Sequence, residues 1–134
     1  MFKLDSKLQA DTFFITDLKL SSLLLMNNAN YPWLILVPRQ ENVSELTDLS
    51  FEDQIEVLKE INLVCQILQN FFKPYKLNIA NLGNVVRQLH IHLIARFEND
   101  LSFPKPVWGS DSKFYEKSEA EKLINQIQSY LKNE

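Results

Sequence analysis

The sequence is poor in several residue types that mark common functional sites. It contains one cysteine, Cys65, so neither an intrachain disulfide nor a multi-cysteine metal site can form. It contains two glycines, Gly83 and Gly109, which excludes a glycine-rich phosphate-binding loop. No serine lies in a Gly-x-Ser-x-Gly turn, so a serine hydrolase of that type is excluded as well.

Long apolar runs and clusters of one charge are also missing. No stretch approaches the ~20 apolar residues of a membrane span. The N-terminal residues MFKLDSKLQADTFF are charged and lack the apolar centre of a signal peptide. Lysine and arginine are scattered and the formal net charge is -3, so we expect no extended nucleic-acid footprint. These features favour a soluble, cytoplasmic protein that does not associate with membranes.

The composition is that of one packed domain. Hydrophobic residues make up 46% of the chain, including nine phenylalanines and four tyrosines, as is typical of a folded globule. The 134 residues can bury a single core, and they contain no internal repeat, low-complexity tract or linker. We therefore expect a single domain over residues 1–134.

The order of the apolar segments predicts an α+β fold. Residues 12–16 and 18–26 are typical of a hairpin, and residues 32–39 of a third strand between two prolines. Residues 76–83 and 88–97 are expected to form two further strands. The expected architecture is a largely antiparallel five-stranded sheet with one long helix and a C-terminal helix.

Helical periodicity begins after Ser50, which can cap the first turn, and ends at Pro74. A second helix is expected to begin at a cap on Ser118. We expect the first helix to bury one apolar stripe, in which the cysteine is a small core residue. The stripe comprises Ile55, Leu58, Val64, Cys65, Leu68, Phe71 and Phe72.

Both histidines of the chain, His90 and His92, lie in the segment RQLHIHLIARF. Because side chains alternate between the two faces of a strand, Gln88 and the two histidines share one face and the intervening apolar residues share the other. Two neighbouring imidazoles can divide nucleophilic and proton-donating tasks near neutral pH.

The segment NLGNVVR before the histidines adds further polar groups. Gly83 permits an unusual backbone angle or the close approach of a ligand. Asn81, Asn84 and Arg87 add hydrogen-bond donors.

The pattern alone allows three interpretations of this polar row. It can be the solvent-facing side of an antiparallel sheet, where glutamine and histidine are ordinary residues. It can hold zinc, but there is no third histidine and nothing places a carboxylate beside the pair, so we expect no metal site. It can also catalyse phosphorus chemistry, with one imidazole attacking and the other protonating the leaving oxygen.

The stretch NLGNVVRQLHIHLIAR, with the preceding strand PWLILVPR, resembles the histidine triad (HIT) superfamily of nucleotide hydrolases and transferases, in particular bacterial diadenosine tetraphosphate hydrolases. Members carry His-x-His-x-His followed by two apolar residues. LLLMNN is similar to the end of the family's nucleoside-binding strand, and the helix after Ser50 lies where the family has its main helix. The resemblance covers most of the chain and implies the HIT-like fold.

The resemblance implies roles for the residues of the polar row. His90 matches the nucleophile, which attacks the α-phosphorus of a nucleotide and forms a nucleotidyl-histidine intermediate. His92 matches the last histidine, which contacts the phosphate and helps the leaving group, and Gln88 occupies the first catalytic position of the triad. The nucleotide-binding set that the resemblance and the polar pattern suggest comprises Asn27 or Asn28 at the ribose, Asn84 at the phosphate, and Asn81, Gly83 and Trp108.

The sequence departs from the family pattern in ways that bear on substrate and activity. Gln88 replaces the first histidine, and an amide cannot shuttle a proton near pH 7. Val85 stands where many members have a hydroxyl, and the loop from Asn81 is about four residues shorter than the family pattern.

The resemblance implies a homodimer that acts on dinucleoside polyphosphates or nucleoside phosphoramidates. It implies no tightly bound cofactor, although Mg²⁺ can accompany the nucleotide. The alternatives are a nucleotide-binding module with reduced or lost catalysis and an unrelated α+β scaffold.

Overall fold

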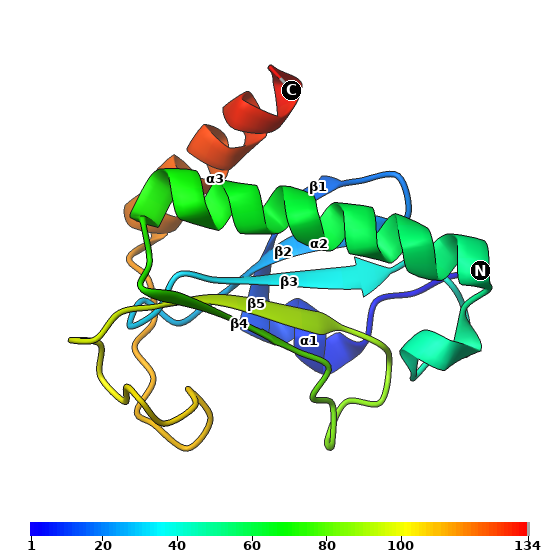
Figure 1. Cartoon of the computed structure of the whole chain (residues 1–134), viewed down its shortest axis with the longest axis horizontal. Coiled ribbons are helices and arrows are strands. Elements are labelled where there is room, and N and C mark those ends of the chain that lie inside the picture. Colours follow the sequence, from blue (N-terminus) through cyan, green and yellow to red (C-terminus); the bar gives the residue numbers. More distant parts are fainter. Residues whose placement is uncertain (134) are drawn as a thin grey trace.

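The computed structural model describes residues 1–133; residue 134 of the expected domain lies outside the described part. One five-stranded sheet organises the chain, with each strand antiparallel to its neighbours in the order β1-β2-β3-β5-β4 (Figure 1). The strands are β1 (Thr12–Asp17), β2 (Ser21–Met26), β3 (Trp33–Pro38), β4 (Lys76–Ala80) and β5 (Ile91–Arg96). The predicted α+β class and antiparallel sheet are confirmed.

The long helix α2 (Phe51–Phe72) begins as predicted, since the Ser50 hydroxyl accepts a hydrogen bond from the amide of Asp53. The C-terminal helix α3 (Lys117–Lys132) begins earlier than predicted, because Glu116 rather than Ser118 is its N-terminal cap. Two short helices were not predicted, α1 (Ser6–Asp11) and the 3₁₀ helix η1 (Leu46–Asp48).

The predicted apolar stripe of α2 is wrong in its N-terminal half. Ile55 and Leu58 are exposed, at 44% and 57%. Glu60 is buried instead, because its carboxylate accepts hydrogen bonds from the amides of Leu20 and Ser21 in the β1–β2 turn. This polar anchor turns a different face of the helix toward the sheet, which buries Val57, Glu60, Val64, Ile67 and Leu68. The thiol of Cys65 is partly rather than fully buried.

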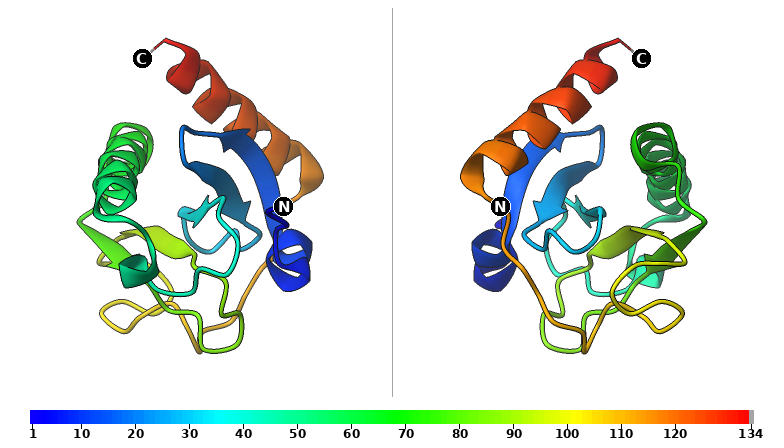
Figure 2. Two further views of the ribbon diagram at one scale, coloured as in Figure 1. Left: turned by 90° about the vertical axis from the view of Figure 1, so that its right-hand side faces the viewer. Right: turned by 90° about the vertical axis from the view of Figure 1, so that its left-hand side faces the viewer.

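The two faces of the sheet are covered by different parts of the chain (Figure 2). Helices α2 and α3 cover one face and form the main hydrophobic core with it. The N-terminal segment with α1, and the loop after β5, cover the other face around Trp33, Ile35 and Val107. Both sides of the central strands are therefore shielded from solvent.

Among the described residues, none of the helices combines the length and the apolar character that a membrane crossing requires.

Candidate functional site

The two histidines lie at the beginning of β5, on the sheet face opposite α2. Strand β5 begins at Ile91, so His90 and Gln88 precede it rather than belonging to it as predicted. The predicted alternation of faces holds nevertheless: Leu89 and Ile91 lie in the core under α2, whereas His92 pairs across the sheet with Ile35 of the opposite cluster.

Both imidazoles are buried, with 4% of His90 and 3% of His92 exposed. Their ring centroids are 4.8 Å apart. The rings of Trp33 and Trp108 cover His92, at centroid distances of 5.6 and 5.0 Å. The interpretation of the polar row as a solvent-facing sheet surface is therefore wrong, because aromatic side chains cover this end of the strand.

The position of the ring proton of His90 follows from its hydrogen bond. Nδ1 lies 2.7 Å from the backbone carbonyl oxygen of Gln88. Because a carbonyl only accepts, Nδ1 must carry the proton, and the neutral ring keeps its lone pair on Nε2. This is the tautomer that a nucleophilic histidine needs.

His92 holds the opposite tautomer. The indole Nε1–H of Trp33 donates to Nδ1 of His92 over 3.0 Å, and an indole cannot accept. The ring proton is therefore on Nε2, which lies 3.1 Å from the carbonyl oxygen of Leu82. Burial, together with repulsion from the charge of His90, lowers the pKa of His92 to about 4. At neutral pH His92 is a neutral ring that donates through Nε2.

Gly83 packs against the ring of His90. A Cβ atom added at this position would lie 2.4 Å from the carbonyl oxygen of Val86 and 2.9 Å from Cε1 of His90. The close neighbour of Gly83 is thus the ring of His90, and the close approach of a ligand stays a prediction. The predicted unusual backbone angle is wrong here, because the glycine with positive φ is Gly109.

Two cavities flank the histidine pair and divide the predicted nucleotide-binding residues between them. A cavity of about 490 Å³ is lined by Asn27, Asn28, Trp33 and Trp108, with Phe114. A smaller, polar cavity of about 220 Å³ is lined by Ser44, Glu45, Asn81, Gly83, Asn84 and Arg87. Trp33 connects the first cavity to His92, and Gly83 connects the second to His90.

The two asparagines of the larger cavity have different surroundings. Asn28 is buried, and its side-chain oxygen accepts hydrogen bonds from the amides of Asn30 and Lys113. Asn27 is half-buried, and its side-chain oxygen accepts from the amide of Tyr115 over 2.9 Å. Both residues therefore hold the segment before α3 against the end of β2. Asn28 is the more buried of the two, and its side-chain oxygen accepts two hydrogen bonds rather than one.

The loop that carries Trp108 is held by an ion pair that the sequence did not reveal. Arg96, with 1% of its surface exposed, donates to the carboxylate of Asp100 from Nε and Nη2, and to the carbonyl of Lys105. Burial would raise the pKa of Asp100, but hydrogen bonds from Arg96 and from the amides of Phe97 and Phe103 lower it to about 2. The spacing of four residues between Arg96 and Asp100 was the available signal.

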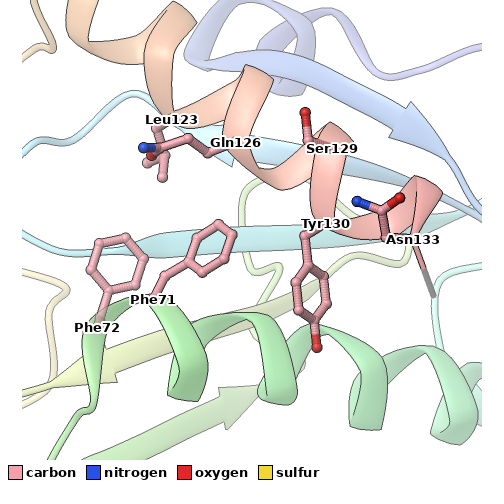
Figure 3. A pocket seen from close by; sticks show the side chains of 7 residues that line it. All are labelled: Phe71, Phe72, Leu123, Gln126, Ser129, Tyr130 and Asn133. Carbon is pink, nitrogen blue, oxygen red and sulfur yellow. The ribbon is translucent and has the colours of Figure 1, made fainter.

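A further cavity, of about 460 Å³, lies on the other side of the sheet between the end of α2 and α3 (Figure 3). Phe71, Phe72, Leu123 and Tyr130 line it. It contains none of the predicted site residues. No group of three or more histidine, cysteine, aspartate or glutamate side chains that could hold a metal ion occurs within residues 1–133.

The family model of the HIT domain matches residues 7–99. The chain belongs to the HIT domain family. No curated protein matches the chain significantly.

Solved structures of HIT proteins cover nearly the whole chain. A histidine triad protein from Bradyrhizobium japonicum is 42% identical, covers 96% of each chain and superimposes with a TM-score of 0.93. One from Sinorhizobium meliloti is 39% identical, with the same coverage and TM-score. One from Marinobacter aquaeolei is 36% identical, with 99% of this chain and 98% of that chain covered and a TM-score of 0.95. The predicted HIT-like fold is confirmed.

Proposed function

We propose that this HIT protein is a nucleotide hydrolase or transferase that cleaves at the α-phosphorus of nucleoside phosphates. The observation that carries the proposal is the hydrogen bond from Nδ1 of His90 to the carbonyl of Gln88. It fixes the tautomer in which Nε2 can attack phosphorus, and the buried site limits competition from water.

The proposed reaction has two displacements. Nε2 of His90 attacks the α-phosphorus, a P–N bond to the histidine forms, and the bond from phosphorus to the leaving phosphate or amine breaks. The proton on Nδ1 stays in its hydrogen bond to the Gln88 carbonyl, which stabilises the positive charge that the ring acquires. Water then attacks the phosphorus and loses a proton to the solvent, and the P–N bond to His90 breaks. This step releases the nucleoside monophosphate and restores the lone pair of Nε2.

His92 is assigned one of the two tasks that the family resemblance implies, the contact with the phosphate, but not the help to the leaving group. A ring whose pKa is about 4 and whose Nδ1 accepts from Trp33 is not a ready acid at neutral pH. We infer that its Nε2–H turns from the carbonyl of Leu82 to a non-bridging phosphate oxygen when substrate binds. His92 thus stabilises developing charge on the phosphate. A phosphate or polyphosphate leaves as an anion, and an amine takes its proton from a water molecule.

The cavities suggest where the two parts of the substrate bind. The larger one has aromatic walls and the half-buried amide of Asn27, which suit a nucleoside. The smaller one has Asn84 and Arg87, which suit the phosphate and the leaving group. Dinucleoside polyphosphates, including diadenosine tetraphosphate, and nucleoside phosphoramidates are the substrate classes to test. Mg²⁺ would enter with a polyphosphate rather than as a resident ion.

The exposed edge of the sheet supports the expected homodimer. β4 is an edge strand, and Tyr75 and Ile79 on or beside it are 65% and 50% exposed. Phe51, Ile55 and Leu58 form an exposed apolar row on α2. An unpaired strand edge can pair antiparallel with the same edge of a second copy, which gives a closed twofold assembly. Sedimentation of the wild type beside Ile79→Lys tests this, since a monomeric wild type would contradict it.

The second candidate function is a nucleotide-binding module without turnover. It is favoured by Gln88, because the first triad position cannot titrate and its side chain is bound to the N-terminal segment. This alternative predicts the same ligands but no chemical product.

Turnover and binding measured together separate the two functions. The compounds to test are a diadenosine polyphosphate, an adenosine phosphoramidate and ATP. Each is incubated with the wild type, with His90→Ala and with His90→Gly. Asn62→Ala, on the exposed side of α2, is the matched control. Cleavage that is lost in both His90 variants while calorimetry still detects binding supports the hydrolase. Binding without cleavage supports the nucleotide-binding module. The absence of both binding and cleavage would contradict both functions.

A further inference from the structure

Gln88 contacts both the N-terminal segment and the nucleophile. Its side-chain oxygen accepts from the amide of Asp5 over 2.8 Å, and its side-chain nitrogen donates to the carbonyl of Lys3 over 2.9 Å. Its backbone carbonyl accepts from Nδ1 of His90 over 2.7 Å. One residue at the first triad position therefore links two parts of the chain more than eighty residues apart.

The paired side-chain bonds require an amide. The carbonyl of Lys3 and the amide of Asp5 flank one residue, Leu4, so a single planar group must offer a donor and an acceptor to the same stretch of backbone. A glutamine side chain does this. The two nitrogens of an imidazole point in divergent directions, so a histidine at position 88 cannot make both bonds.

The anchored segment continues to the larger cavity. The carboxylate of Asp5 caps α1 by accepting from the amides of Lys7 and Leu8. Leu8 is buried against the sheet, and α1 ends at Asp11, which lines the cavity with Asn27. The carbonyl of Asp11 also accepts from the backbone amide of Asn27. The position of this cavity wall therefore depends on where residues 3–5 are held.

We propose that Gln88 is a positioning residue that couples the N-terminal wall of the nucleotide cavity to His90. The glutamine at the first triad position holds residues 3–5, so it is a functional replacement for the histidine rather than a loss. The proposal rests on the proposed function, because the wall that Gln88 positions is a wall of the nucleotide site. Its side-chain amide is bonded to residues 3–5 and acts through α1 and Asp11.

Two substitutions at Asp5 isolate the hydrogen bond to Gln88. The φ angle of Asp5 is −54°, which proline can adopt. Asp5→Pro removes both the capping carboxylate and the amide hydrogen, whereas Asp5→Ala removes the carboxylate alone. The difference between these variants contains the amide contact to Gln88 and the stiffening of the backbone by proline. The same pair in a Gln88→Ala background gives the effect of proline alone and completes a double-mutant cycle.

We expect Asp5→Pro to raise the KM and Kd for the nucleotide about fivefold more than Asp5→Ala does, and this difference to shrink in the Gln88→Ala background to the effect of the proline ring alone. Gln88→Ala itself should raise KM about tenfold and change kcat less than threefold, because its backbone carbonyl remains beside His90. Gln88→His should behave like Gln88→Ala, although it rebuilds the family's triad.

Hydrogen exchange provides a readout that does not need activity. The amides of residues 5–8 should exchange faster in Gln88→Ala and Gln88→His than in the wild type, and bound nucleotide should slow them in the wild type alone. Unchanged exchange and KM in Gln88→Ala would overturn the proposal, as would a difference between the two Asp5 variants that is equally large without the glutamine. If the Gln88 substitutions speed up exchange at residues 5–8 but the wild type binds no nucleotide, Gln88 does hold the N-terminal segment and the proposed function is wrong.

Discussion

The indole Nε1–H of Trp33 donates to Nδ1 of His92 over 3.0 Å, and this bond determines what His92 can contribute. It holds the ring proton on Nε2 and opposes protonation of Nδ1. Trp33 belongs to β3 and also lines the larger cavity. The residue that faces the proposed nucleoside site is thus the one that sets the tautomer beside the nucleophile.

Replacing Trp33 by phenylalanine tests this relationship. Trp33→Phe keeps an aromatic ring on the strand but removes the donor, so the carbonyl of Leu82 alone then favours Nε2–H. The share of the Nδ1–H tautomer should therefore rise, and kcat should fall about tenfold. Nitrogen NMR of the imidazoles reports the tautomer directly. Trp108→Phe is the matched control, because Trp108 packs on the same ring and is predicted to leave the tautomer unchanged. An unchanged share of the two tautomers in Trp33→Phe would contradict the role given to Trp33.

The lowered pKa of His92 predicts a loss of stability in mild acid. The folded ring has a pKa of about 4 against an ordinary value of 6.5, so the unfolded chain binds a proton that the folded protein excludes. The free energy of unfolding should therefore fall as the pH drops from 6.5 to about 4, by up to about 3 kcal/mol. Urea unfolding across this range measures it. His92→Asn should flatten the dependence of the unfolding free energy on pH. An unchanged dependence would mean that other groups cause the loss of stability.

Gly83→Ala should impair both the fold and the site. The added methyl group would meet backbone at Val86 and the ring of His90, so we expect a destabilisation of about 2 kcal/mol and at least a tenfold loss of kcat. Gly109→Ala is the contrasting variant: its methyl group meets no atom within 4 Å, but its positive φ adds strain. Retained turnover in Gly83→Ala would show that the ring of His90 can shift without loss.

The Arg96–Asp100 pair is predicted to hold the loop that places Trp108 on His92. Asp100→Asn leaves a buried guanidinium without its counter-charge and should cost about 3 kcal/mol in urea unfolding. The pKa of Asp100 is about 2 in the folded protein, against an ordinary value of 3.8. Its contribution to stability is therefore complete above pH 3.8 and is lost as the pH falls through 2. Glu121→Gln, in an exposed helical pair, is the control and should have no measurable effect. Equal stability of the two variants would contradict the buried pair's role.

Local patterns predicted the parts of the fold that depend on neighbours in sequence. The alternation around His90 and His92 placed the histidines on the correct face, and the Ser50 cap placed the start of α2. The register of the α2 stripe failed because Glu60 bonds to the turn at Leu20, forty residues away. The helical periodicity of apolar residues alone does not show which face of a helix makes such a distant polar contact.

The contacts that give the site its chemistry could not be predicted for the same reason. Trp33 and His92 are 59 residues apart, and Gln88 and Lys3 are 85 apart. Each pair depends on the sheet order and on loops whose paths the sequence does not specify. The residue types at positions 88, 90 and 92 suggested the reaction, but tautomers and burial required the three-dimensional structure.

The mass of the protein during turnover tests most directly whether His90 is the nucleophile. Wild-type protein mixed with a diadenosine polyphosphate or an adenosine phosphoramidate and quenched within milliseconds should gain one adenylyl group, which peptide mapping places on His90. The adduct should be absent from His90→Ala and should decay in the wild type as free nucleotide appears. Product release without any protein-bound nucleotide, or an adduct on another residue, would contradict His90 as the nucleophile.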